Sequence, residues 1–325
     1  MSSREDDLIA RYFRPLATDP GALGLIDDAA LLKPSGDDLV VTADAIVEGV
    51  HFLPDDPPET IARKALRVNL SDLAAKGATP AGFVLTLALR EANEAWLAPF
   101  ARALGEDAAA FDCPLLGGDT VSTPGPLMIS ITAFGRVPPG AMVRRDSAKA
   151  GDRIAVTGTI GDAALGLRLL GNRIAGEGLD ASSRDFLIQR YRVPQPRNAL
   201  AHAIRDHASA AMDVSDGLAG DLAKLCAASK VSATVEMASV PFSAPARGLL
   251  ANGSVDAETL VSGGDDYEVI CTVPENRWEA FVAAARLAGV AVSRIGVISA
   301  GADGPSFRDA DGKPIVLKRL SYSHF

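Results

Sequence analysis

Runs of apolar, β-branched residues alternate along the chain with segments in which apolar residues recur at helical spacing. The first pattern predicts strands, and the second predicts amphipathic helices. The predicted strands cover residues 38–44, 82–90, 126–137, 153–158, 232–237, 267–273 and 294–298. The predicted helices cover residues 57–78, 93–111, 163–171, 196–208, 217–229 and 277–289. Alternation of this kind is typical of a mixed α and β protein.

Local signals add detail to this outline. Asn93 is expected to be the N-cap of helix 93–111. Segment 303–317, with Asp311 and Gly312 at its centre, predicts a β-hairpin. The polar segment 138–152 contains proline and glycine and predicts a junction. Since 325 residues are about twice a typical domain, we expect two domains, residues 1–140 and 141–325.

Composition narrows the class of protein. Hydrophobic residues make up 48% of the chain and charged residues 22%, which is ordinary for a folded globular protein. A net charge of −9 argues against a nucleic-acid-binding protein, because such domains are usually basic.

Targeting and redox signals are weak. The start of the chain is charged and lacks the apolar core of a signal peptide. No apolar run reaches the ~20 residues of a membrane span. Cys113, Cys226 and Cys271 are scattered, which suggests neither a disulfide framework nor a zinc site. We expect a cytoplasmic protein that binds neither nucleic acid nor membranes.

Two common nucleotide signatures are missing. The Walker pattern G-x-x-x-x-G-K-[ST] does not occur. The segment "VTGTIGDAALG" has only Gly158 and Gly161 where the dinucleotide fingerprint needs a further glycine. A tight strand-to-helix turn is therefore expected there, and a dehydrogenase is excluded.

Aspartates recur beside apolar segments and often beside glycine, in "LIDDAALL", "VVTADAIVEGVHF", "NLSDLAAKG", "LLGGDT", "MDVSDG" and "GGDDYE". Carboxylates without neighbouring His or Cys favour hard cations such as Mg²⁺ or Ca²⁺. None of these segments follows the calcium-loop pattern. Because Mg²⁺ keeps waters and takes phosphate oxygens as ligands, scattered aspartates suit it better. We therefore expect magnesium to neutralise the crowded acids and to hold phosphate.

For single residues, simpler interpretations stay open. Asp213, Ser215 and Asp216 could instead cap helix 217–229. Asp221 is interpreted as a solvated helical residue. Arg145 could bind phosphate through its planar guanidinium or be an exposed linker residue.

Six motifs in order resemble a known family: "DDAALL", "ADAIVEGVHF", "VNLSDLAAKGATP", "LLGGDT", "MDVSDGLAGDL" and "SGGDDYEV". Together they closely resemble the thiamine-monophosphate kinase family of the aminoimidazole ribonucleotide synthetase-like superfamily. The resemblance runs from about residue 7 to the final "SYSHF". It implies an α+β, two-domain fold of that superfamily, with N-terminal domains that pair in a homodimer and a C-terminal α/β sandwich. It also implies phosphorylation of thiamine monophosphate by ATP to thiamine diphosphate.

The resemblance also implies roles for individual residues. The implied magnesium ligands are Asp28, Thr42, Asp44, Asp72, Asp119 and Asp213, with Asp216 beside a further ion. The implied ATP-binding residues are Gly118, Asp119, Arg145 and Ser215. The implied contacts to thiamine monophosphate are His51, Asp265 and Tyr322.

Three positions depart from the family pattern. Ile26 stands where the family usually has Gly, and Ala43 stands where it usually has Thr. Asp265 replaces the family's Glu, which keeps the charge but shortens the side chain by one methylene.

The chemistry implied by the resemblance fits these residues. Phosphoryl transfer needs mainly positioning and charge neutralisation. Because the acceptor phosphate is already ionised near neutral pH, no strong general base is needed, and we expect direct in-line transfer with several Mg²⁺ ions and no phosphoenzyme. The alternatives are another ATP-dependent enzyme of the superfamily, such as aminoimidazole ribonucleotide synthetase, or a non-catalytic Mg-ATP-binding protein.

Overall fold

The computed structural model describes residues 7–26 and 29–321. The chain divides into two compact units: unit 1 comprises residues 1–73 and 78–140, and unit 2 comprises residues 74–77 and 141–325. Within the described residues, no helix has the length and apolar character needed to cross a membrane.

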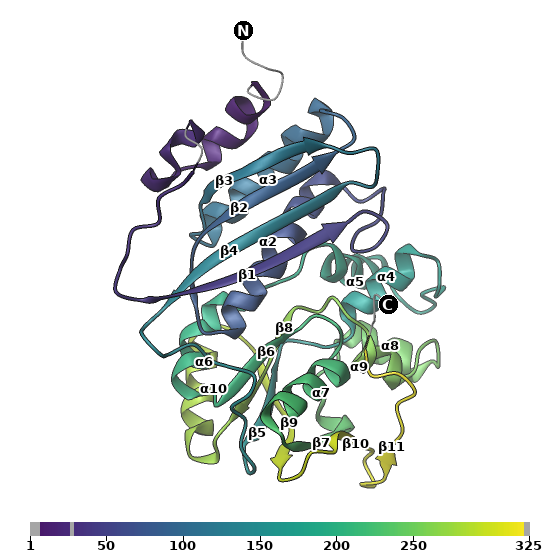
Figure 1. The fold of residues 1–325 in the computed structure, drawn as a ribbon. Helices are drawn as coiled ribbons and strands as arrows, with labels where there is room; N and C mark the ends of the chain where they lie inside the picture. The colour runs from purple at the N-terminus through teal and green to yellow at the C-terminus, as the bar shows by residue number, and fades with distance from the viewer. Residues whose placement is uncertain (1–6, 27–28, 322–325) are drawn as a thin grey trace. The chain divides into compact units, whose positions relative to one another are not determined.

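Unit 1 is built on a four-stranded sheet with the strand order β1-β4-β2-β3 (Figure 1). The strands are β1 (Asp38–Val47), β2 (Thr79–Leu89), β3 (Leu115–Ser122) and β4 (Met128–Val137). β2 and β3 run parallel, whereas the other neighbours are antiparallel. The helices α2 (Pro58–Ala75) and α3 (Glu94–Ala110) lie against one face of the sheet (Figure 1). Helical turns η1 (Ile9–Phe13), η2 (Arg14–Leu16) and η3 (Pro20–Leu25) precede it.

The two faces of this sheet differ in burial. Along β4 buried and partly exposed residues alternate, because successive side chains of a strand point to opposite faces. Ile129 and Ile131 are buried on the helix-covered face. On the opposite face of β1, the side chains of Leu39 and Val41 are 46% and 55% exposed. Apolar side chains are therefore left uncovered on that face.

Unit 2 is built on a seven-stranded mixed sheet with the order β11-β10-β7-β9-β5-β8-β6. Its strands are β5 (Arg153–Thr157), β6 (Ala210–Val214), β7 (Ser232–Glu236), β8 (Glu268–Val273), β9 (Val292–Ser299), β10 (Gly304–Arg308) and β11 (Pro314–Ile315). Its α-helices are α4 (Asp162–Leu170), α5 (Ala181–Arg192), α6 (Ala201–His207), α7 (Leu218–Ser229), α8 (Ala244–Ala251), α9 (Ala257–Ser262) and α10 (Trp278–Leu287). Short turns η4 (Asn198–Leu200), η5 (Met237–Ser239) and η6 (Glu275–Arg277) connect them.

Helices cover both faces of the unit 2 sheet. Every residue of β6 and β8 is buried, which is typical of strands enclosed on both sides. Met212 and Val214 of β6 pack in one cluster with Leu222 of α7. Ala211 of β6 packs in a second cluster with Phe281 of α10. The alternating side chains of one strand thus reach two separate cores.

The predicted elements are present, with ends shifted by a few residues. Asn93 is confirmed as an N-cap, because its side chain accepts from the Ala95 N–H. The hairpin is confirmed as the antiparallel pair β10–β11. The sequence pattern did not predict β3, β6, α5, α8 or α9. β3 was missed because half of it is the polar motif "GGDT", which lacks strand-like alternation.

Candidate functional site

Three of the residues predicted from the sequence lie on two elements of unit 1, Thr42 and Asp44 on β1 and Asp72 on α2. Thr42 and Asp44 are two residues apart on β1 and so share a face of the sheet. The Thr42 hydroxyl donates a hydrogen bond to the Asp72 carboxylate of α2. The Asp44 N–H donates to Asn69 Oδ1, one helical turn before Asp72, at 3.1 Å. Asn69 is fully buried and was not singled out by the sequence patterns.

Gly118 and Asp119 lie on β3, at the other edge of the same sheet. Three strand spacings separate β3 from β1, which amounts to about 14 Å. Both residues line a pocket of about 280 Å³, together with apolar side chains that include Phe13 and Leu25. Position 118 requires glycine, because a Cβ there would lie 1.9 Å from the Leu85 carbonyl oxygen.

His51 sits in a loop that is tightly fixed after β1. Its Nδ1 accepts a hydrogen bond from the Val47 N–H at 3.1 Å. A neutral His51 therefore carries its proton on Nε2. The buried Lys64 of α2 donates from Nζ to the His51 carbonyl oxygen at 2.8 Å, and Asp56 accepts from the Leu53 N–H at 2.8 Å. Lys64 and Asp56 were not predicted as part of the site.

In unit 2, two of the sequence motifs form one corner. β6 pairs with β8, so that Val214 lies opposite Glu268. Beyond this pair, the Asp265 N–H donates to the Ser215 carbonyl oxygen and the Tyr267 N–H donates to the Val214 carbonyl oxygen, both at 2.8 Å. The structure thus joins the segment of Asp213, Ser215 and Asp216 to the loop of Asp265. Asp213 itself lies within β6 and is buried.

The loop before α7 is shaped by Asp221. Its Oδ2 accepts hydrogen bonds from the N–H groups of Ser215 and Asp216, at 3.0 and 2.9 Å. The side chain is fully buried, so the interpretation of Asp221 as a solvated residue is wrong. The capping alternative is wrong as well, because Gly217 is the N-cap of α7 and no side chain caps the helix there.

Lys224 offsets part of the negative charge in this loop. Its Nζ forms ion pairs with Asp216 and, at 2.8 Å, with Asp221. Burial raises the pKa of the Asp221 carboxyl. Burial lowers the pKa of Lys224, but the bonds to Asp216 and Asp221 outweigh this effect and leave the pKa raised. A lysine, which the motifs did not point to, thus neutralises acids at the place where magnesium was expected.

Arg145 lies away from this corner. Its backbone carbonyl accepts a hydrogen bond from Ser229, the last residue of α7, at 2.8 Å. Ser215 and Asp216 lie at the opposite end of this 12-residue helix, about 17 Å away along its axis. The Arg145 side chain is exposed.

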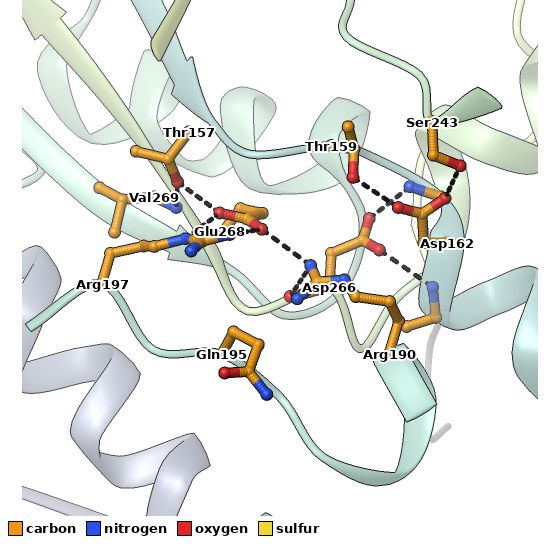
Figure 2. A network of polar contacts seen from close by, with 12 residues as sticks. Thr157, Thr159, Asp162, Arg190, Gln195, Arg197, Ser243, Asp266, Glu268 and Val269 are labelled. Atoms are coloured by element: carbon orange, nitrogen blue, oxygen red, sulfur yellow. Dashed lines mark hydrogen bonds and ion pairs between the residues drawn. The ribbon is translucent and has the colours of Figure 1, made fainter. Parts of the chain in front are cut away.

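Asp266 and Glu268, which follow Asp265 in the chain, belong to a buried network of charged groups (Figure 2). Glu268 accepts from Arg190 at 2.8 Å, from Arg197 at 2.5 and 2.6 Å, and from Thr157 at 2.6 Å. Asp266 accepts from two backbone N–H groups at the start of α4, those of Gly161 and Ala163. Burial raises the pKa of the Asp266 carboxyl well above its usual range, although Arg190 opposes this. A glutamate inside the apolar run "YEVICTV" was the sequence signal for such a network.

The donors available for a metal ion are oxygen atoms. The side chains predicted as metal ligands, Thr42, Asp44, Asp72, Asp119 and Asp213, all carry oxygen donors, which are the type that Mg²⁺ prefers. Among the described residues, no three His, Cys, Asp or Glu side chains come close enough together to form a metal site. Asp28 and Tyr322, two further predicted site residues, lie outside the described residues.

Comparisons with known proteins cover both units. Residues 26–137 match the family model of the AIR synthase related protein N-terminal domain, and residues 149–306 match that of the C-terminal domain. A thiamine-monophosphate kinase from Caulobacter vibrioides is 46% identical over 98% of this chain and 90% of its own length.

Solved structures agree with these matches. The crystal structure of a thiamine-monophosphate kinase from Stenotrophomonas maltophilia is 41% identical and has a TM-score of 0.85, covering 97% of this chain and 99% of its own. A structure described as AaThiL complexed with AMPPCP and TMP is 29% identical and has a TM-score of 0.78, covering 94% and 97% of the two chains.

Proposed function

The chain belongs to the thiamine-monophosphate kinase family of AIR synthase related proteins, and we propose that it transfers the γ-phosphoryl group of ATP to thiamine monophosphate. The products are thiamine diphosphate and ADP. The observation that carries this proposal is the full-length similarity to thiamine-monophosphate kinases, at 46% identity over 98% of the chain. The similarity to a structure complexed with AMPPCP and TMP adds support for the two substrates.

The proposed site uses the residues expected from the sequence. Magnesium ligands come from Asp28, Thr42, Asp44, Asp72, Asp119, Asp213 and Asp216. ATP contacts come from Gly118, Asp119, Arg145 and Ser215. Contacts to thiamine monophosphate come from His51, Asp265 and Tyr322. Magnesium, when bound, would supply the positive charge that offsets the negative charge of the phosphates during transfer.

Each group that the chain supplies has a definite task. His51 presents an Nε2–H donor toward an anion, because its Nδ1 is bonded to Val47. Gly118 lets β3 lie close to Leu85 of β2, which fixes the strand that carries the proposed ATP contacts. Asp265 supplies a carboxylate that can pair with a cationic ring. Because the acceptor phosphate is already ionised, these residues position and neutralise, and the phosphoryl group passes in line without a phosphoenzyme.

The protein is proposed to act as a homodimer in the cytoplasm. The uncovered apolar side chains of β1, Leu39 and Val41, support pairing of unit 1 with a second copy. Cys113, Cys226 and Cys271 are free and buried thiols, in keeping with a reducing compartment.

Product analysis by mass spectrometry tests the function. Purified protein is mixed with ATP, Mg²⁺ and thiamine monophosphate, and a chelator is added to a parallel sample. We expect thiamine diphosphate and ADP in equal amounts, and no product with the chelator. The Asp44→Asn variant is expected to lose most activity while it melts close to the wild-type temperature. ATP binding without any product would contradict the proposed reaction and favour a non-catalytic binding protein.

A further inference from the structure

The loop at residues 263–267 has a backbone conformation that needs support. Asp265 and Tyr267 have φ angles of +71° and +49°. Residues other than glycine seldom adopt such angles, and they keep them only where surrounding groups fix the backbone. The proposed substrate contact, Asp265, is therefore held in place by its neighbours rather than by its own preference.

Several hydrogen bonds supply part of this support. The N–H groups of Asp265 and Tyr267 donate to the carbonyl oxygens of Ser215 and Val214. Between them, the Asp266 carboxylate accepts from Gly161 at 2.6 Å and from Ala163 at 3.2 Å. Successive residues of the loop are thus tied to different elements, β6 on one side and the start of α4 on the other.

Arg190 of α5 completes the support. Its Nη2 donates to the Asp266 carbonyl oxygen at 3.1 Å and to Glu268 Oε1 at 2.8 Å (Figure 2). The Asp266 carbonyl belongs to the peptide group that joins Asp266 to Tyr267, so this bond prevents the peptide from rotating. Arg190 is only 7% exposed, and its Nε has no hydrogen-bond partner among the described residues. The hydrogen bonds of Arg190 that the structure shows go to the loop and to Glu268.

Glu268 is in turn held from the other side. Arg197 binds both of its carboxylate oxygens, and Thr157 donates to one of them. Buried ion pairs seldom add much net stability, because desolvation offsets the attraction. The cluster is next to a loop in which Asp265 and Tyr267 have positive φ angles. Its role is better explained by the conformation that it imposes on this loop.

We propose that Arg190 is a positioning residue, which acts through the Asp266 carbonyl and Glu268 to aim the Asp265 carboxylate at thiamine monophosphate. The inference rests on the proposed function, since it assigns Asp265 to the acceptor substrate. In this proposal Arg190 acts only through its bonds to the Asp266 carbonyl and Glu268. Its effect should therefore appear in the binding of thiamine monophosphate and hardly in that of ATP.

Steady-state kinetics of Arg190→Met and Arg190→Lys test this inference. For Arg190→Met, we expect the KM for thiamine monophosphate to rise about tenfold or more, because bonds from a charged donor are lost. Lysine keeps the charge and one donor, so Arg190→Lys should recover part of the loss. The KM for ATP should change less than about twofold in both variants. Arg184→Met, on the same helix, is the matched control and should leave both KM values unchanged.

The outcomes are distinguishable. If the wild type forms no thiamine diphosphate, the proposed function fails, and this inference fails with it. If the wild type is active but Arg190→Met raises both KM values equally, or neither, the positioning role is wrong. Should the Arg190 variants not fold, Arg197→Lys replaces them, because Arg197 binds Glu268, which Arg190 also binds. It should raise the KM for thiamine monophosphate alone, and equal effects on both substrates would overturn the inference.

Discussion

At the scale of single residues, His51 shows how one hydrogen bond from the backbone can fix the tautomer of a partly buried imidazole. The bond from the Val47 N–H to Nδ1 selects the tautomer with its proton on Nε2. The ammonium group of the buried Lys64 donates a hydrogen bond to the His51 carbonyl oxygen and so fixes the backbone there. While the ring remains neutral, its Nε2 therefore carries the proton and can act only as a donor. A phosphate group is a suitable acceptor for that donor.

Two substitutions of His51 separate these roles. Glutamine can place an amide N–H where Nε2 stands, whereas asparagine can place an acceptor where Nδ1 stands. We expect His51→Gln to keep a KM for thiamine monophosphate within about fivefold of wild type, and His51→Asn to raise it by about tenfold or more, because only the second loses the outer donor. Nitrogen chemical shifts of the imidazole should show the Nε2–H tautomer, with the signal assigned by its loss in His51→Gln. An Nδ1–H tautomer, or equal effects of the two variants, would contradict this account.

The sequence indicated which residues belong to the site better than it indicated which residues bind one another. The aspartates of β1 and α2 were singled out because they lie beside apolar segments, and the family resemblance added Thr42, which does bind Asp72 in the structure. The interpretation of Asp221 as solvated was wrong, because helical spacing alone cannot show that its carboxylate binds the backbone N–H groups of residues 215 and 216. Lys224 was missed for the same reason, since its ion pairs with Asp216 and Asp221 depend on the conformation of the loop before α7.

At the scale of elements, the sheet of unit 1 carries a specific expectation. Helices cover one face, and the other leaves Val41 of β1 and Val121 of β3 55% and 44% exposed. If this face pairs with a second copy, a charge placed on it must be desolvated without a partner. We expect Val41→Glu to convert a dimer into a monomer, as measured by light scattering during size-exclusion chromatography, with an unchanged circular dichroism spectrum.

An exposed leucine elsewhere provides the control. Leu287, at the end of α10 in unit 2, is 91% exposed, and Leu287→Glu should leave the dimer intact. A monomeric wild type would overturn the pairing itself. A dimer that persists in Val41→Glu would move the interface away from this face.

The success of element prediction depended on length and regularity. The long helices α2 and α3 and the alternating strand β4 were predicted because each has many positions that agree. The polar strand β3 was missed although it carries Gly118 and Asp119, because glycine and aspartate disfavour strands on their own. Its pairing with β2 decides its structure, and that pairing is a property of the whole sheet.

At the scale of the whole molecule, the acids predict how ligands change stability. Carboxylates placed near one another repel until a cation binds, and a ligand that binds only the folded protein stabilises it. At Mg-ATP concentrations about 100 times the Kd, the gain is about 2.7 kcal/mol. For domains of this size, that corresponds to a rise of roughly 5–10 °C in melting temperature. Differential scanning fluorimetry with Mg-ATP, and with a chelator added, measures the effect.

Asp119→Asn and Asp213→Asn show whether each unit contributes to this stabilisation, since Asp119 belongs to unit 1 and Asp213 to unit 2. Asparagine keeps the shape of aspartate and removes its charge. Each variant without ligand should therefore melt within about 3 °C of the wild type, which corresponds to about 1 kcal/mol. The rise caused by Mg-ATP should shrink in both variants, because each removes the charge of a proposed metal ligand. A variant that melts much lower without ligand, yet keeps the full rise, would mean that its aspartate supports the fold and takes no part in binding.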